Sequence, residues 1–219
     1  MDFFWNWLFP IFVTLGAIGV VDYKAPKDAR WFYLHCWINL WNLIYAAPDI
    51  YDSVVNPYTE FIQPWSSTYP FAIVAAGHFY HILFFPKLSK MDWLHHITMI
   101  FITLPWTAYF FPLKGVNLAI SGLSGLPGGI DYVLCTLAKL NWIPWETEKN
   151  WNNYIQVWLR APWLIYTCSI GWLFWTAGKL NSHTLVSLLF VFWNACFFMQ
   201  DTLRANYRRE GRKQVQNIE

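Results

Sequence analysis

Histidines gather in one stretch of this sequence, GHFYHILFFPKLSKMDWLHHITMIF, at residues 77–101. It holds His78, His81, His95 and His96, four of the six histidines in the chain. Imidazole is the side chain whose ordinary pKa lies nearest neutrality, so it can take and return a proton in general acid–base catalysis. The residues between these histidines are mostly apolar, where an ionisable group normally faces a polar interior. The stretch therefore indicates a buried polar site, and proton transfer is the chemistry that its histidines suggest.

The composition places these residues in a membrane protein. Of the 219 residues, 56% are hydrophobic, 21% aromatic and only 13% charged, which is too few charges for a soluble domain. Seven segments of roughly 16 to 22 residues lack Lys, Arg and Glu and can cross a hydrocarbon core as helices. The strand alternation of a membrane barrel is absent from the sequence. We therefore expect an all-α fold, an integral membrane bundle of about seven transmembrane helices. The expected segments are Phe3–Val21, Trp31–Ala47, Pro70–Phe85, Trp93–Phe111, Val116–Leu137, Ala161–Ala177 and Thr184–Met199.

The basic residues fall almost entirely on one side of this seven-helix arrangement. Only Lys114 and Lys179 of the 15 Lys and Arg residues lie on the other side. The positive-inside rule then puts the C-terminus and a basic tail at 204–219 on the cytoplasmic or equivalent side. We expect one membrane domain over residues 1–219. The net charge of +2 follows from topology and gives no reason to expect a nucleic-acid partner.

Other polar residues fall in the same layer as the histidines. His35, Asn39 and Asn42 share one helical face through i, i+4, i+7 spacing, and Asp131 is the only carboxylate in the middle of a predicted helix. At about 1.5 Å per residue, Asp131 and five of the histidines lie within about 10 Å of the cytoplasmic helix ends. The sequence thus predicts a polar chamber open to the cytoplasmic leaflet. Its predicted substrate-binding residues are His35, Asn39, Asn42, His78, His81, Gly128 and Gly129.

Two segments suggest special backbone features. SGLSGLPGGIDY, at residues 121–132, interrupts the fifth predicted helix with glycine and proline. Broken backbone at membrane depth is tolerated where it lines a cavity, although small residues also allow close helix packing. A short helix near 147–160 is expected to lie in the membrane interface before the chain turns inward at Pro162.

The segments DWLHHITMIF and GIDYVLCTLAK resemble the TLC-domain family of multi-pass membrane proteins, which includes the ceramide synthases. In that family a histidine pair opens one helix, and an aspartate followed by an apolar run and a lysine lies on the next. His95, His96, Asp131 and Lys139 match this pattern, over a likeness of about residues 20–205. The chain departs from the ceramide synthases at Gly128, where they carry a second aspartate, and in the position of the threonine after the histidines. It is more similar to divergent members of the family that handle lipids.

The resemblance and the residues leave two functions open. One is acyl transfer from acyl-CoA, as co-substrate, to a lipid amine or hydroxyl, with His95 or His96 as base and Asp131 as the carboxylate that orients it. The other is a non-catalytic lipid-binding or structural subunit of a larger membrane protein complex, whose partners would be membrane lipids and other subunits. The family default for localisation is the endoplasmic reticulum.

Metal binding is a third interpretation. His78-x-x-His81 and the His95–His96 pair could surround zinc or iron. Membrane oxidases with histidine boxes resemble one another in carrying about twice as many histidines at wider spacing. On that comparison we expect no metal and no permanently bound cofactor.

Overall fold

A computed structural model describes residues 4–85 and 87–216, so Phe3, the expected start of the first segment, and the last three residues of the tail lie outside it. All regular elements within the described ranges are helices, as the all-α expectation requires. The only extended pairing recorded there is an isolated bridge between Pro64 and Leu113. The α-helices are α1 Phe9–Tyr23, α2 Arg30–Val55, α3 Pro57–Glu60, α4 Tyr69–Phe84, α5 Lys90–Thr98, α6 Leu104–Phe110, α7 Lys114–Ile120, α8 Leu126–Lys139, α9 Trp145–Tyr154, α10 Ala161–Thr176 and α11 Ser182–Gln216.

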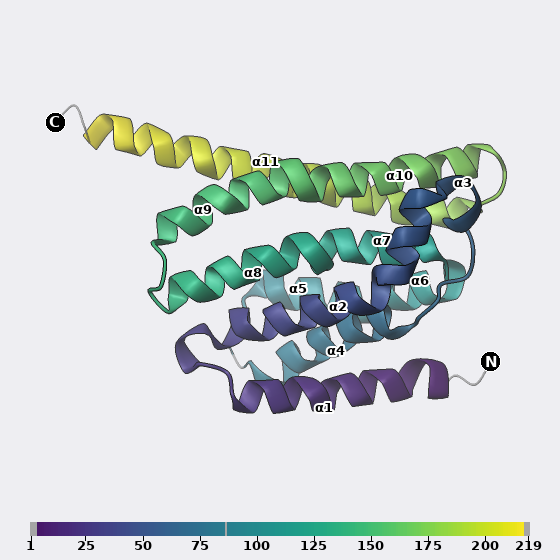
Figure 1. The fold of residues 1–219 in the computed structure, drawn as a ribbon, viewed down its shortest axis with the longest axis horizontal. Helices are drawn as coiled ribbons and strands as arrows, with labels where there is room; N and C mark the ends of the chain where they lie inside the picture. Colours follow the sequence, from purple (N-terminus) through teal and green to yellow (C-terminus); the bar gives the residue numbers. More distant parts are fainter. Residues whose placement is uncertain (1–3, 86, 217–219) are drawn as a thin grey trace.

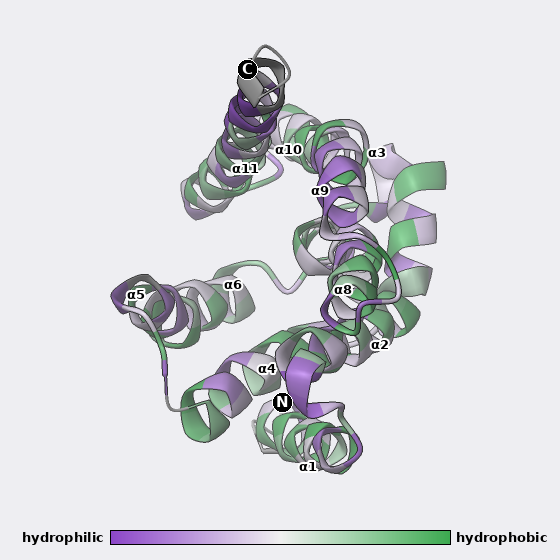
Figure 2. Ribbon diagram, turned by 90° about the vertical axis from the view of Figure 1, so that its left-hand side faces the viewer, coloured by the Kyte–Doolittle hydropathy of each residue, from purple (hydrophilic) through white to green (hydrophobic). Residues whose placement is uncertain are grey.

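The long helices run side by side along one axis (Figure 1). α2 packs against α8, α7 and α4, α1 lies on α4, and α10 lies on α11. In the end-on view of Figure 2 these helices form an arc from α1 to α11, with α5 and α6 standing on its open side. α5 contacts α4, while α6 contacts α11. α5 and α6 are therefore less enclosed than α2 or α8.

The chain reverses direction at each connection, so the connections fall at two ends of the bundle (Figure 1). The α1–α2 and α8–α9 connections, the end of α4 and the start of α5 share one end with the C-terminal end of α11. The start of α1, α3 and the α10–α11 connection lie at the opposite end. The basic connections identified in the sequence thus gather at one end of the molecule.

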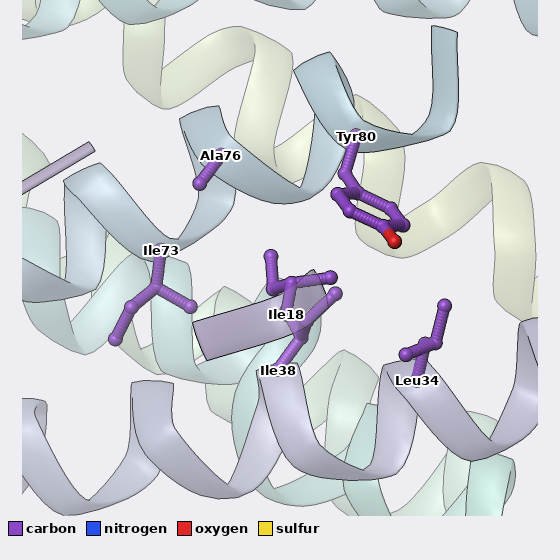
Figure 3. Packing of buried hydrophobic residues seen from close by; sticks show 6 residues of the cluster. All are labelled: Ile18, Leu34, Ile38, Ile73, Ala76 and Tyr80. Atoms are coloured by element: carbon purple, nitrogen blue, oxygen red, sulfur yellow. The ribbon is translucent and has the colours of Figure 1, made fainter. Parts of the chain in front are cut away.

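The first core lies between α1, α2 and α4 (Figure 3). Its fully or nearly buried members are Ile18, Leu34, Ile38, Ile73, Ala76 and Tyr80. At the edge of this core, Asp22 of α1 accepts hydrogen bonds from the guanidinium of Arg30, at 2.6 and 2.5 Å, and from the Tyr80 hydroxyl at 2.6 Å. Asp22 therefore ties the three helices together beside the apolar contacts.

A π-helical turn precedes four of the prolines inside the long helices. The turns are Phe4–Leu8 before Pro10, Met99–Thr103 before Pro105, Ser121–Gly125 before Pro127 and Ile155–Arg160 before Pro162. Proline has no N–H to donate and its ring crowds the carbonyl four residues earlier. A wider turn relieves this crowding without ending the helix. Each helix consequently continues through its proline.

This continuity corrects two expectations. The glycine-rich segment does not break the fifth predicted helix, since α7, the π turn and α8 form one helical run over Lys114–Lys139. The segment near 147–160 is helical, but it continues directly into α10 and does not turn at Pro162. In both cases a π turn changes the winding of the helix locally, and the helix continues beyond it.

Within the described residues, three helices are long and apolar enough to cross a membrane, Trp5–Tyr23, Lys114–Lys139 and Ser182–Arg212. α4 is apolar, but its 16 residues make it shorter than these three. The membrane character expected from composition is thus supported by three helices, which is fewer than the seven crossings predicted.

Candidate functional site: a histidine cluster between α4 and α5

The structure brings together the four histidines of the opening stretch. His78 and His81 lie on one face of α4, while His95 and His96 lie in α5. The Nδ1 atoms of His78 and His96 are 2.7 Å apart, so one ring donates a hydrogen bond and the other accepts it. The ring centroids of His78 and His95 are 5.0 Å apart, and those of His81 and His96 are 4.4 Å apart. We call these four residues the histidine cluster.

Local sequence positions the cluster. The i, i+3 spacing places His78 and His81 on the same side of α4. α5 begins with a capping box, in which the Ser89 hydroxyl accepts from the Asp92 N–H and the Asp92 carboxylate accepts from the Ser89 N–H. This cap stabilises the first turn of α5, the turn that precedes His95 and His96.

Burial differs within the cluster. His96 is only 4% exposed, whereas His95 is exposed. His78 and His81 are partly buried, and the Nδ1 atom of His81 is buried without a hydrogen-bond partner. The cluster thus has a buried side at His96 and an open side at His95.

Aromatic rings connect the cluster with α2. The Trp31 ring lies between His81, at a centroid distance of 3.6 Å, and His35, at 3.7 Å. His35 donates a hydrogen bond from Nδ1 to the Trp31 carbonyl at 2.9 Å, and its other side faces the Tyr132 ring at 4.4 Å. The fifth predicted histidine is therefore next to the cluster but separated from it by Trp31.

The two asparagines of α2 form helix contacts, not a lining of the histidine cluster. Asn39 and Asn42 are buried, and the side-chain oxygen of Asn42 accepts a hydrogen bond from the Ser121 hydroxyl of the π turn at 3.4 Å. A Cβ added at Gly128 would lie 3.3 Å from the Asn39 amide oxygen, and one at Gly129 would lie 3.5 Å from the Asn39 Cβ. These glycines allow α8 to approach α2 closely. The glycine-rich segment therefore serves close helix packing at this contact, and does not line a cavity there.

Asp131 does not lie with the histidines. Its carboxylate accepts a hydrogen bond from the Asn152 side chain of α9 at 2.5 Å. Its carboxylate, the Cys135 sulfur and the buried Glu148 carboxylate lie within 4.8 Å of one another. No hydrogen bond between Asp131 and a histidine is recorded in the described part of the chain, so the expected orienting contact is absent from this arrangement. The next residue, Tyr132, faces His35 instead, because one residue turns a helix by about 100°.

Asp92 is the carboxylate that lies beside the histidine cluster, and it was not predicted from the sequence. Asp92 precedes His95 and His96 by three and four residues, a spacing that places all three on one side of α5. Hydrogen bonds from Ser89 hold the pKa of Asp92 below its ordinary value, and nearby His81 and His96 lower it further. Asp92 therefore supplies a negative charge beside the cluster, and the i, i+4 spacing could have identified it.

Comparisons with protein-family models, with curated proteins and with solved structures gave no match.

Proposed function

We propose that this chain is a multi-pass membrane protein of lipid handling that transfers an acyl group from acyl-CoA to a lipid hydroxyl or amine. The observation that carries the proposal is the hydrogen bond between His78 and His96 inside a cluster of four imidazoles. Such a hydrogen bond orients the two rings and couples their tautomers, because one ring must donate while the other accepts. The resemblance of the segment around His95 and His96 to the TLC-domain family, which includes the ceramide synthases, supports this choice between the two functions left open by the sequence.

The roles of the histidines follow from their contacts. When His96 donates its Nδ1 proton to His78, its Nε2 lone pair is free to accept the proton of the acceptor hydroxyl or amine. The acceptor oxygen or nitrogen then attacks the thioester carbonyl carbon, the carbon–sulfur bond breaks, and the imidazolium returns the proton to the departing thiolate. In this proposal His96 is the base and His78 is a positioning residue.

In this proposal Asp92, and not Asp131, is the carboxylate that supplies negative charge beside the base. It lies one turn before His96 in α5 and interacts with His81 and His96. A carboxylate in that position stabilises the imidazolium that forms during transfer through its charge, without needing a hydrogen bond to the ring.

The proposed setting is a membrane crossed by seven helical segments, with the cluster near the basic end of the bundle. The proposal is supported by the alternation of connections between two ends and by the basic residues gathered at one of them (Figure 1). Exposed Lys87 and Lys90, just before and at the start of α5, would attract the phosphates of CoA to that end. The C-terminus would then face the cytoplasm, and the endoplasmic reticulum is the membrane we propose.

The test is turnover of labelled acyl-CoA with a panel of lipid acceptors, using purified full-length protein. We expect wild-type turnover, its loss in His96→Gln, and its retention in His183→Gln. His183 is a suitable control because it is exposed and packs on Trp106 and Phe110, away from the cluster. No turnover with any acceptor, together with the same co-purified lipid in wild type and His96→Gln, would contradict acyl transfer. That result would support the lipid-binding or assembly subunit.

A further inference from the structure

We propose that His78, His95 and His96 form a binding site for a divalent transition metal, with Zn²⁺ as the ion that fits best. One ring nitrogen of each of these three residues lies within 4.8 Å of the others. Three imidazoles and one open position make up a common coordination set for catalytic zinc.

The spacing of the nitrogens requires only small side-chain adjustments. Two ligands of a tetrahedral zinc ion with bonds of about 2.0–2.1 Å lie about 3.3 Å apart. The Nδ1 atoms of His78 and His96 are now 2.7 Å apart because they share a hydrogen bond. A metal ion would replace that shared proton, and the two rings would separate by about 0.6 Å. The third ligand, His95, is exposed and can rotate inward from the open side.

A second observation also points to a ligand at this place. The Nδ1 atom of His81 is buried without a hydrogen-bond partner, which is costly for a polar atom. Its ring centroid is 4.4 Å from that of His96, and stacking on Trp31 holds its orientation. His81 is outside the three-histidine ligand set, and water bound to the ion would give its Nδ1 atom a partner.

The chemistry of the donors selects the class of ion. Neutral imidazoles suit zinc, copper, nickel and iron, whereas magnesium and calcium require mainly oxygen ligands. Asp92 lies beside the cluster and interacts with His81 and His96, so its charge would partly offset that of a dication. The exposed side at His95 leaves a route for the ion to enter.

Metal binding goes beyond the proposed acyl transfer and does not rest on it. An ion bound by His96 would occupy a nitrogen of the ring that proton transfer uses. The metal-bound form is therefore inactive as a general base, and Zn²⁺ is an inhibitor of the proposed reaction.

The test uses Co²⁺ as a spectroscopic probe for zinc in the purified, chelator-treated full-length protein. We expect one Co²⁺ per chain with the intense visible absorption of a tetrahedral site, displaced by Zn²⁺. His78→Gln and His95→Gln should each weaken binding about 10- to 100-fold or more. His183→Gln removes a histidine outside the ligand set and should leave the spectrum unchanged.

Two results would overturn the metal site. One is the absence of tetrahedral Co²⁺ bands in the wild type at excess metal. The other is a spectrum that survives in both ligand variants. Should a ligand variant fail to fold, X-ray absorption of the zinc-loaded wild type decides the question, because the site requires about three imidazole nitrogens around the ion. None of these measurements depends on turnover, so they separate failure of the metal site from failure of acyl transfer.

Discussion

Replacing Gly122 by alanine tests whether the glycine-rich segment is a packing surface. Gly122 lies in the π turn between α7 and α8, facing α10. An added Cβ would lie 2.6 Å from Trp163 Cδ1 and 2.8 Å from Leu164 Cδ2, which is too close for contact. Trp163 cannot move freely because its indole N–H donates to the Leu118 carbonyl at 3.0 Å. The alanine therefore forces α10 away or breaks that hydrogen bond.

The magnitude follows from three contributions. Overpacking costs about 1–3 kcal/mol, and loss of the Trp163 hydrogen bond costs about 1 kcal/mol. Alanine returns up to about 1 kcal/mol in helix propensity. The net loss in the free energy of unfolding is about 1–3 kcal/mol, or roughly 2–4 °C in melting temperature per kcal/mol for a chain of this size.

The assay is thermal denaturation in detergent micelles followed by circular dichroism, with Gly16→Ala as the matched control. Gly16 lies within α1 and an added Cβ would meet nothing within 4 Å, so this variant should be as stable as wild type or more so. If Gly122→Ala melts no lower than Gly16→Ala, the close contact between the segment and α10 is refuted. The segment would then be open enough to line a cavity.

Three further outcomes are expected. Asp49→Ala should lower the free energy of unfolding by about 2–4 kcal/mol, as measured by chemical denaturation. The reason is that the buried Asp49 carboxylate accepts hydrogen bonds from the Ser66 N–H at 3.0 Å and from the Asn117 side chain at 2.6 Å. Asp92→Asn should lower the melting temperature at neutral pH, because hydrogen bonds from Ser89 hold the folded-state pKa of Asp92 below its ordinary value and so favour the folded protein with Asp92 charged. The difference from wild type should be lost as the pH falls through that lowered pKa, and melting curves over a pH series measure it; a difference that persisted at the lowest pH would contradict the prediction. Zn²⁺ should inhibit acyl transfer and a chelator should restore it; activation by Zn²⁺ would contradict the proton-transfer role of His96.

Sequence periodicity predicted the convergence of the histidines well. Depth along a helix depends only on residue count, so His78, His81, His95 and His96 could be assigned to one layer before their contacts were known. The i, i+3 spacing also put His78 and His81 on one face of α4. The all-helical fold followed equally from composition, because only helices and closed barrels satisfy the backbone in lipid.

Rotation about the helix axis could not be predicted in the same way. Asp131 was expected to face the histidines, but Asn152 of α9 is its hydrogen-bond partner, while Tyr132 faces His35. Which of two adjacent residues points inward depends on the neighbours of α8, and the sequence alone does not state those neighbours. The expected helix break at residues 121–132 and the expected turn at Pro162 were wrong for a different reason. A π turn can accommodate a proline that the usual rules treat as a helix break.

The rate of acyl transfer in His96→Gln, compared with wild type and His183→Gln, tests the central role of the histidine cluster most directly. Removal of a general base is expected to lower kcat by about 10²- to 10⁴-fold, with little change in the KM for acyl-CoA and with helical content preserved. His183→Gln should retain the wild-type rate. Equal rates in wild type and His96→Gln would contradict the proposed base and assign the cluster a structural role.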